Sequence, residues 1–176
     1  MPSTRLTPEK WLKAGFEALQ SLGPQALAAE PLARALGTTK GSFYWHFKDV
    51  PSYQDALLNE WRKAALSNVV TLLQQQEEPD QRLRRFGRSI LNDPVEANLR
   101  IWARTDPRVA QILSEIDAER RKYLTRLLAQ LGLSNPDFAR ALQAALIGLP
   151  QLTPHEDADH AAPFDTLVDT VCALSR

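Results

Sequence analysis

Polar, basic and aromatic side chains are concentrated in one short segment near the start of the sequence. Residues 38–47 read TTKGSFYWHF, so two threonines, a lysine and a serine precede five ring-bearing side chains. Short hydroxyl and ammonium side chains suit the base edges of the DNA major groove, and phenol, indole and imidazole donors suit phosphate oxygens. The segment therefore carries the chemistry of a surface that contacts DNA.

The charge distribution is compatible with a local anion-binding surface on an otherwise neutral protein. Twenty-one basic residues balance twenty-one acidic ones, which argues against a protein that coats nucleic acid indiscriminately. Residues 31–48 differ from this average, because they contain Arg34, Lys40 and Lys48 but no Asp or Glu. This positive stretch includes the polar and aromatic segment.

Patterns typical of catalysis or metal binding are missing from the sequence. It has no glycine-rich phosphate loop, no nucleophile elbow and no paired-histidine zinc motif. Cys172 is the single cysteine, so a thiolate zinc site or a redox pair is impossible. Residues 155–160, HEDADH, offer imidazoles and carboxylates, but their polarity predicts an exposed loop without supporting groups for a metal. We expect no enzyme activity, no catalytic residue, no cofactor and no metal.

The remaining bulk properties are those of a cytoplasmic globular protein. Hydrophobic residues make up 44% and charged residues 24% of the chain. Residues 1–10 are polar, unlike a signal peptide, and no run of apolar residues reaches the length of a membrane span.

Helical periodicity covers nearly the whole sequence, whereas alternating strand patterns are almost absent. In the first helix, Leu12, Gly15, Phe16 and Leu19 form the predicted buried face, with Trp11 and Leu22 at its margin. We predict an all-α fold of about nine helices, at 7–22, 31–36, 40–47, 49–76, 81–91, 95–104, 107–131, 137–149 and 163–174. The first three, with a glycine in the turn before the third, describe a helix-turn-helix. In the third helix, Thr39 is the expected N-cap, and Phe43 and Phe47 are expected to face the core.

The sequence from Gly37 to Lys48, GTTKGSFYWHFK, resembles the DNA-binding domain of the tetracycline-repressor (TetR) family of transcriptional regulators. The glycine turn, the threonine cap and the final Tyr-x-His-Phe run carry the resemblance, which covers residues 5 to about 62. It implies a helix-turn-helix domain at 1–48 and a ligand-binding and dimerisation domain at 49–176. The expected DNA contacts are Thr38, Thr39, Lys40, Ser42, Tyr44, Trp45, His46 and Lys48.

Two positions depart from the family pattern. Ala28 stands where members usually carry the Ser or Thr cap of the second helix, and Val50 stands where many carry a lysine that contacts phosphate. Lys48 lies two residues before Val50, so we expect DNA affinity either to be lower than the family pattern implies or to depend more on Lys48.

For the C-terminal domain, the resemblance implies a small-molecule pocket and a homodimer. Candidate ligand contacts are Trp61, Phe86, Trp102, Tyr123 and Phe138, and the alternative for each is a place in the ordinary core or the dimer interface. Apolar stripes on the last two helices are expected to pair with those of a second copy: Phe138, Leu142, Ala145 and Leu149, then Phe164, Leu167, Val168 and Val171. The implied function is a repressor that a ligand releases from operator DNA. The alternative is a helical protein-interaction module without specific DNA binding, which would lack the steep salt dependence of phosphate contacts.

Overall fold

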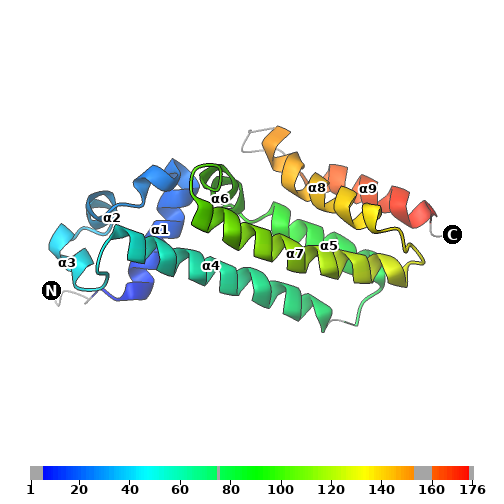
Figure 1. Ribbon diagram of the computed structural model, residues 1–176, viewed down its shortest axis with the longest axis horizontal. Coiled ribbons are helices and arrows are strands. Elements are labelled where there is room, and N and C mark those ends of the chain that lie inside the picture. Colours follow the sequence, from blue (N-terminus) through cyan, green and yellow to red (C-terminus); the bar gives the residue numbers. More distant parts are fainter. Residues whose placement is uncertain (1–5, 75, 153–159, 175–176) are drawn as a thin grey trace. The chain divides into compact units, whose positions relative to one another are not determined.

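The computed structural model describes residues 6–74, 76–152 and 160–174. Helices make up most of this described part, which contains no strand. The all-α prediction with about nine helices is confirmed (Figure 1). The helices are α1 (Pro8–Leu22), α2 (Ala29–Ala35), α3 (Lys40–Tyr44), α4 (Val50–Leu73), α5 (Pro79–Leu91), α6 (Glu96–Trp102), α7 (Pro107–Gln130), α8 (Pro136–Leu152) and α9 (Ala161–Leu174), with a short 3-10 helix, η1 (Pro24–Ala26), after α1.

Several helices start where the sequence places a proline. Helices α1, α5, α7 and α8 each begin with one, because the N–H that proline lacks would have no partner in the first turn. In two of these helices, the side chain of the residue before the proline caps a backbone N–H of the first turn. Asp106 Oδ1 accepts a hydrogen bond from the Arg108 N–H, and Asn135 Oδ1 accepts one from Asp137, both at 2.9 Å.

Two helices near the N-terminus differ from the predicted bounds. Helix α2 begins at Ala29, two residues before Pro31, because a proline is tolerated within the first turn. Helix α3 ends at Tyr44 instead of Phe47, because the N–H groups of His46 and Phe47 both bond to the Phe43 carbonyl in a closing turn. The predicted end of α4 at residue 76 is also wrong, since the helix ends at Leu73.

The chain forms two compact units, each built from two stretches of sequence. The first unit comprises Met1–Lys63 and Asn98–Ile112, and the second comprises Ala64–Ala97 and Leu113–Arg176. The predicted division between residues 48 and 49 separates a DNA-binding role from the rest, and it stays a prediction.

In the first unit, α1, α2 and α3 gather around the beginning of α4 (Figure 1). Its centre is an aromatic cluster of Trp11, Phe43, Phe47 and Tyr53. The Phe43 ring lies 5.3 Å from Trp11 and 5.2 Å from Tyr53, and Phe47 lies 4.9 Å from Tyr53. The Tyr53 hydroxyl donates a 2.8 Å hydrogen bond to the Trp11 carbonyl, and burial raises the pKa of this hydroxyl.

This cluster corrects the predicted face of α1. Trp11, expected at the margin, is fully buried, because Phe43 packs edge-on against its indole. Leu12 and Phe16, expected at the centre, are only half-buried, and Leu22 is 63% exposed. Gly15 and Leu19 are buried as predicted, so the buried face of α1 keeps these two residues and extends to Trp11 and Ala14 in place of Leu12 and Phe16.

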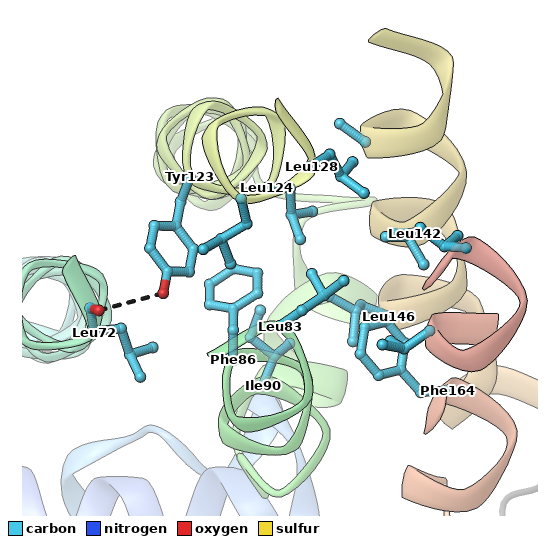
Figure 2. Close-up of a cluster of buried hydrophobic side chains, with 14 of the residues drawn as sticks. Leu72, Leu83, Phe86, Ile90, Tyr123, Leu124, Leu128, Leu142, Leu146 and Phe164 are labelled. Atoms are coloured by element: carbon cyan, nitrogen blue, oxygen red, sulfur yellow. Dashed lines mark hydrogen bonds between the residues drawn. The ribbon is translucent and has the colours of Figure 1, made fainter. Parts of the chain in front are cut away.

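The second unit has a continuous apolar core of side chains from α4, α5, α7, α8 and α9 (Figure 2). Phe86 and Tyr123 pack with ring centroids 4.9 Å apart, and the Tyr123 hydroxyl donates to the Leu72 carbonyl at 3.3 Å. Helices α5 and α9 cross closely at Gly87, where an added Cβ would lie 2.1 Å from the Phe164 ring.

Half of the apolar stripes on α8 and α9 are buried inside this unit. Leu142, Phe164, Val168 and Val171 lie in the core, which corrects the expectation that they face a second copy. They are buried because α8 and α9 pack against α5 as well as against each other.

Candidate nucleic-acid interface

Helix α3 is held at its start by a glycine turn and a threonine cap. Gly37 has φ of +62°, a left-handed conformation that glycine adopts without a Cβ clash, and it reverses the chain after α2. Thr39 Oγ1 accepts a hydrogen bond from the Ser42 N–H at 3.4 Å, which confirms the predicted N-cap. Both features fix where the polar residues before and within α3 point.

The aromatic residues of this segment divide between the interior and the surface. Phe43 and Phe47 are buried in the aromatic cluster, as predicted. Tyr44 is 46% exposed and Trp45 is 88% exposed, although both are large ring systems that folding normally covers. An indole this exposed gains little from folding, so its presence on the surface favours a role in binding.

The eight predicted DNA contacts all lie in α3 or in the residues beside it. Five are exposed: Thr39, Lys40, Tyr44, Trp45 and Lys48. Three are half-buried: Thr38, Ser42 and His46. Their contacts with DNA stay predictions, and the structure brings them together on one short segment.

Gly41 lies among these residues with open space in front of it. A Cβ added there would have one neighbour within 4 Å, Thr39 Oγ1 at 3.6 Å, which is an ordinary contact. Packing within the chain therefore does not require glycine at this position. A close approach of the backbone to a partner such as DNA would require it.

Two carboxylates near this segment are engaged in local contacts. Hydrogen bonds from the Ser52 hydroxyl and N–H hold the pKa of the Asp49 carboxyl below its usual value, with Lys48 adding a smaller effect. The pKa of the Glu9 carboxyl is also lowered, chiefly by a hydrogen bond from Thr7 and to a small extent by nearby His46. Both carboxyl groups therefore carry a negative charge near neutral pH. The positive charge that attracts an anion must come from residues such as Lys40 and Lys48.

Alanine substitutions should distinguish the role of the exposed Trp45 from that of the buried Phe43. We expect Trp45→Ala to change the free energy of unfolding by less than about 0.5 kcal/mol, because the indole is exposed. Phe43→Ala should cost about 3 kcal/mol or more, because it empties the centre of the aromatic cluster. If Trp45 contacts DNA, its loss should also lower operator affinity several-fold. Urea unfolding and fluorescence-anisotropy titration with operator DNA measure the two effects, and unchanged affinity would remove Trp45 from the interface.

The five aromatic residues predicted to contact a ligand are divided between the two units. Trp61 and Trp102 belong to the first, and Phe86, Tyr123 and Phe138 belong to the second. Phe86 and Tyr123 are packed core residues, and Phe138 is half-buried at the edge of that core. A ligand-binding role for these residues stays a prediction.

The sequence analysis missed a buried polar cluster in the second unit. Arg120 donates to Glu96 at 2.7 Å with both side chains buried, and Gln143 donates to the Asp117 carbonyl at 2.8 Å. One signal was available in the sequence, because Arg120 occupies the apolar register of α7 between Ile116 and Leu124. Its acidic partner lies 24 residues away on α6, and no spacing rule predicts that pairing.

Two further sequence patterns concern metal binding and membrane insertion. Residues 155–159 of the HEDADH segment lie outside the described residues. Within the part of the chain that the structure describes, no group of three or more His, Cys, Asp and Glu side chains is arranged to hold a metal. Nor is any helix there long and apolar enough to cross a membrane.

Comparison with known families gives the helix-turn-helix its identity. Residues 12–49 match the family model of bacterial regulatory proteins of the tetR family. Residues 12–49 therefore form a DNA-binding domain of the tetR family. The match includes the glycine turn, the capped helix α3 and the aromatic run that follows it, so the protein is a DNA-binding transcriptional regulator.

Solved structures share the fold of this chain over nearly its whole length. A transcriptional regulator of Rhodococcus sp. Rha1 superposes with a TM-score of 0.76 at 18% identity, covering 96% of this chain and 95% of its own. SmeT, the repressor of the Stenotrophomonas maltophilia multidrug efflux pump SmeDEF, gives 0.67 at 19%, covering 97% and 91%. A Saccharomonospora viridis protein in complex with choline gives 0.73 at 16%, covering 93% and 94%. No curated protein matches the sequence significantly.

Proposed function

We propose that this TetR-family regulator is a repressor that binds a near-palindromic operator as a homodimer and is released by a small-molecule effector. The observation that carries the proposal is the exposed face of α3 and its flanks, where Lys40, Tyr44, Trp45 and Lys48 surround an unhindered Gly41. Such a face can enter a major groove and contact the phosphates beside it. A protein with one such helix gains affinity by presenting two copies to two half-sites.

The outward faces of α8 and α9 support the homodimer. On α8, Ala141, Ala144 and Leu152 are exposed, whereas Leu142 lies in the core. On α9, Leu167 and Leu174 are 40% and 62% exposed. Small and apolar residues on two adjacent helices suit a self-complementary interface, in which each copy offers the same surface to the other.

Two considerations support control by a small molecule. The fold is shared with a regulator-like protein that holds choline and with the repressor of an efflux pump. The second unit also keeps a buried ion pair, Glu96–Arg120. Because removing two charges from water is costly, such a pair favours a role beyond packing. In the proposed mechanism the effector favours a conformation with lower operator affinity, and the change in operator affinity cannot exceed the effector's own preference for that conformation. If no candidate small molecule changes operator affinity by about fivefold or more, release by an effector is wrong for this chain.

Selection of bound fragments from sheared genomic DNA, followed by salt titration, tests the function directly. We expect a near-palindromic site whose log affinity falls steeply with log salt, because phosphate contacts release counterions. Lys40→Ala and Tyr44→Ala should each lower the affinity roughly 5- to 100-fold, as expected for loss of about 1–3 kcal/mol per contact.

Lys122→Ala is the matched control, because Lys122 is an exposed lysine of α7 in the second unit. It should leave operator affinity unchanged. Recovery of no fragment above background, or a salt-independent interaction, would favour the protein-interaction module instead.

A further inference from the structure

The first unit contains a stretch of sequence far from the helix-turn-helix. Residues 98–112 include the beginning of α7, and they pack in the same unit as α1 to α3 and the first half of α4. A side-chain hydrogen bond also joins this stretch to α1, since Asn98 donates to the Gln20 carbonyl at 3.2 Å. The compact unit that carries α3 is therefore completed by residues that follow α3 by more than fifty positions.

Arg108, in the first turn of α7, makes several hydrogen bonds at once. Its guanidinium donates to Asp55 Oδ1 at 2.7 Å and to Gln54 Oε1 at 3.2 Å, both on α4. It also donates to both carboxylate oxygens of Asp106, at 3.2 and 2.7 Å, and this paired contact holds the guanidinium plane in place. These bonds raise the pKa of Arg108 and lower the pKa of Asp106, with their mutual hydrogen bond as the largest cause in each case.

Gln54 and its neighbour extend this contact toward the DNA-facing helix. While Gln54 Oε1 accepts from Arg108, its amide N–H donates to the Leu27 carbonyl at 3.5 Å, just before α2. Adjacent Tyr53 packs its ring against Phe43 and Phe47. The same turn of α4 therefore touches α7 on one side and supports α3 through the aromatic cluster on the other.

We infer that Arg108 is a positioning residue for operator binding: by fixing the first turns of α4, it sets the orientation of α3. It contacts no predicted DNA-binding residue and acts through Asp55, Gln54 and Tyr53. The inference rests on DNA binding by α3, and it does not depend on an effector or on repression.

The exposure of the Arg108 and Asp55 side chains favours a positioning role over a stabilising one. The side chains of Arg108 and Asp55 are 42% and 53% exposed, so their ion pair contributes little to the free energy of unfolding. Arginine suits a positioning role, because its planar fork reaches several acceptors in a fixed geometry. Loss of the contact should therefore leave the protein folded and change how well α3 fits its groove.

A double-mutant cycle on operator affinity tests the inference with the full-length protein. We expect Arg108→Ala and Asp55→Ala each to lower affinity for the selected operator fragment about three- to tenfold, and the double variant to lose no more than either single variant. The thermal unfolding midpoints of all three should stay close to that of the parent. Arg88→Ala is the control, since Arg88 is an exposed arginine that pairs with Asp165 at 2.6 Å in the second unit, and this variant should bind the operator normally.

The sign of the Asp55→Ala effect separates positioning from a simple charge effect. Removing a carboxylate should raise affinity for DNA if only the net charge of the unit matters, whereas the positioning role predicts a loss. The dependence of log affinity on log salt gives a second criterion. If Arg108 contacts a phosphate directly, Arg108→Ala should reduce this slope, whereas loss of a positioning residue should leave it unchanged. Higher affinity of Asp55→Ala, additive effects in the cycle, or a reduced slope for Arg108→Ala would overturn the inference while leaving operator binding by α3 established.

Discussion

Alanine at position 41 is expected to give a folded and slightly more stable protein that binds its operator poorly. Gly41 lies within α3, and its added Cβ would meet only Thr39 Oγ1, at an ordinary 3.6 Å. Alanine is a better helix former than glycine, so Gly41→Ala should raise the free energy of unfolding by up to about 0.5–1 kcal/mol. On the DNA side the extra methyl group should hold α3 away from the groove.

The expected loss of operator affinity is roughly 5- to 100-fold, because overfilling a closely packed contact costs about 1–3 kcal/mol. Urea unfolding measures the stability, and titration with operator and scrambled DNA measures the affinity. Scrambled DNA serves as the control, because contacts to phosphate alone tolerate a small shift of the helix. Unchanged operator affinity would show that the backbone at Gly41 does not approach the bases.

Alanine at position 15 is expected to have the opposite effect on stability. An added Cβ at Gly15 would lie 1.9 Å from the Tyr53 hydroxyl oxygen and 3.0 Å from its ring carbon Cζ. Tyr53 cannot swing away freely, because its hydroxyl bonds to the Trp11 carbonyl and its ring packs against Phe43 and Phe47. Gly15→Ala should therefore lower the free energy of unfolding by about 1–3 kcal/mol or more. Operator affinity should fall as well, since Tyr53 supports α3.

A second substitution checks this explanation. Tyr53→Phe removes the oxygen that the new methyl group would strike, at a cost of about 1 kcal/mol for the lost hydrogen bond. The double variant Gly15→Ala/Tyr53→Phe should be more stable than Gly15→Ala alone, although the ring carbon still limits the space. Urea unfolding of the four proteins gives the coupling between the two positions. Additive effects would mean that the tyrosine hydroxyl is not the obstacle.

Together the two glycines show how differently one residue type can serve in a helix. Gly15 is required by a side chain of the same unit, and its replacement acts on folding first. Among the residues that the structure describes, none requires glycine at position 41, so its replacement tests an external partner. Measuring stability and DNA affinity for both variants therefore separates residues that build the first unit from residues that face DNA.

The sequence predicted the local features of the DNA-binding segment well. The start of α3 at Lys40, its Thr39 cap and the burial of Phe43 and Phe47 follow from short-range rules. Capping, glycine turns and the 3.6-residue period depend on neighbours within one or two turns, so these features are present in the sequence itself. The exposed positions of Lys40, Tyr44, Trp45 and Lys48 follow from the same periodicity once the buried side is known.

Features that depend on partners far along the chain could not be predicted in this way. Trp11 lies at the centre of the first unit because Phe43 and Tyr53 converge on it from α3 and α4. Half of the apolar stripe residues on α8 and α9 are covered inside the second unit because α5 packs against both helices. Periodicity identifies an apolar face and carries no information about which element covers it.

By itself, the sequence determined the helical class of this protein, the capped start of α3 and the resemblance of its N-terminal segment to the TetR family. Only the tertiary structure placed Arg108 beside Asp55 and Gln54, and Glu96 beside Arg120, because these pairs join residues tens of positions apart. It also distinguished Gly15, which is confined by Tyr53, from Gly41, which is unobstructed. The physical reason is the same in each case: local propensity sets the helices, and the packing between helices decides which side chains meet.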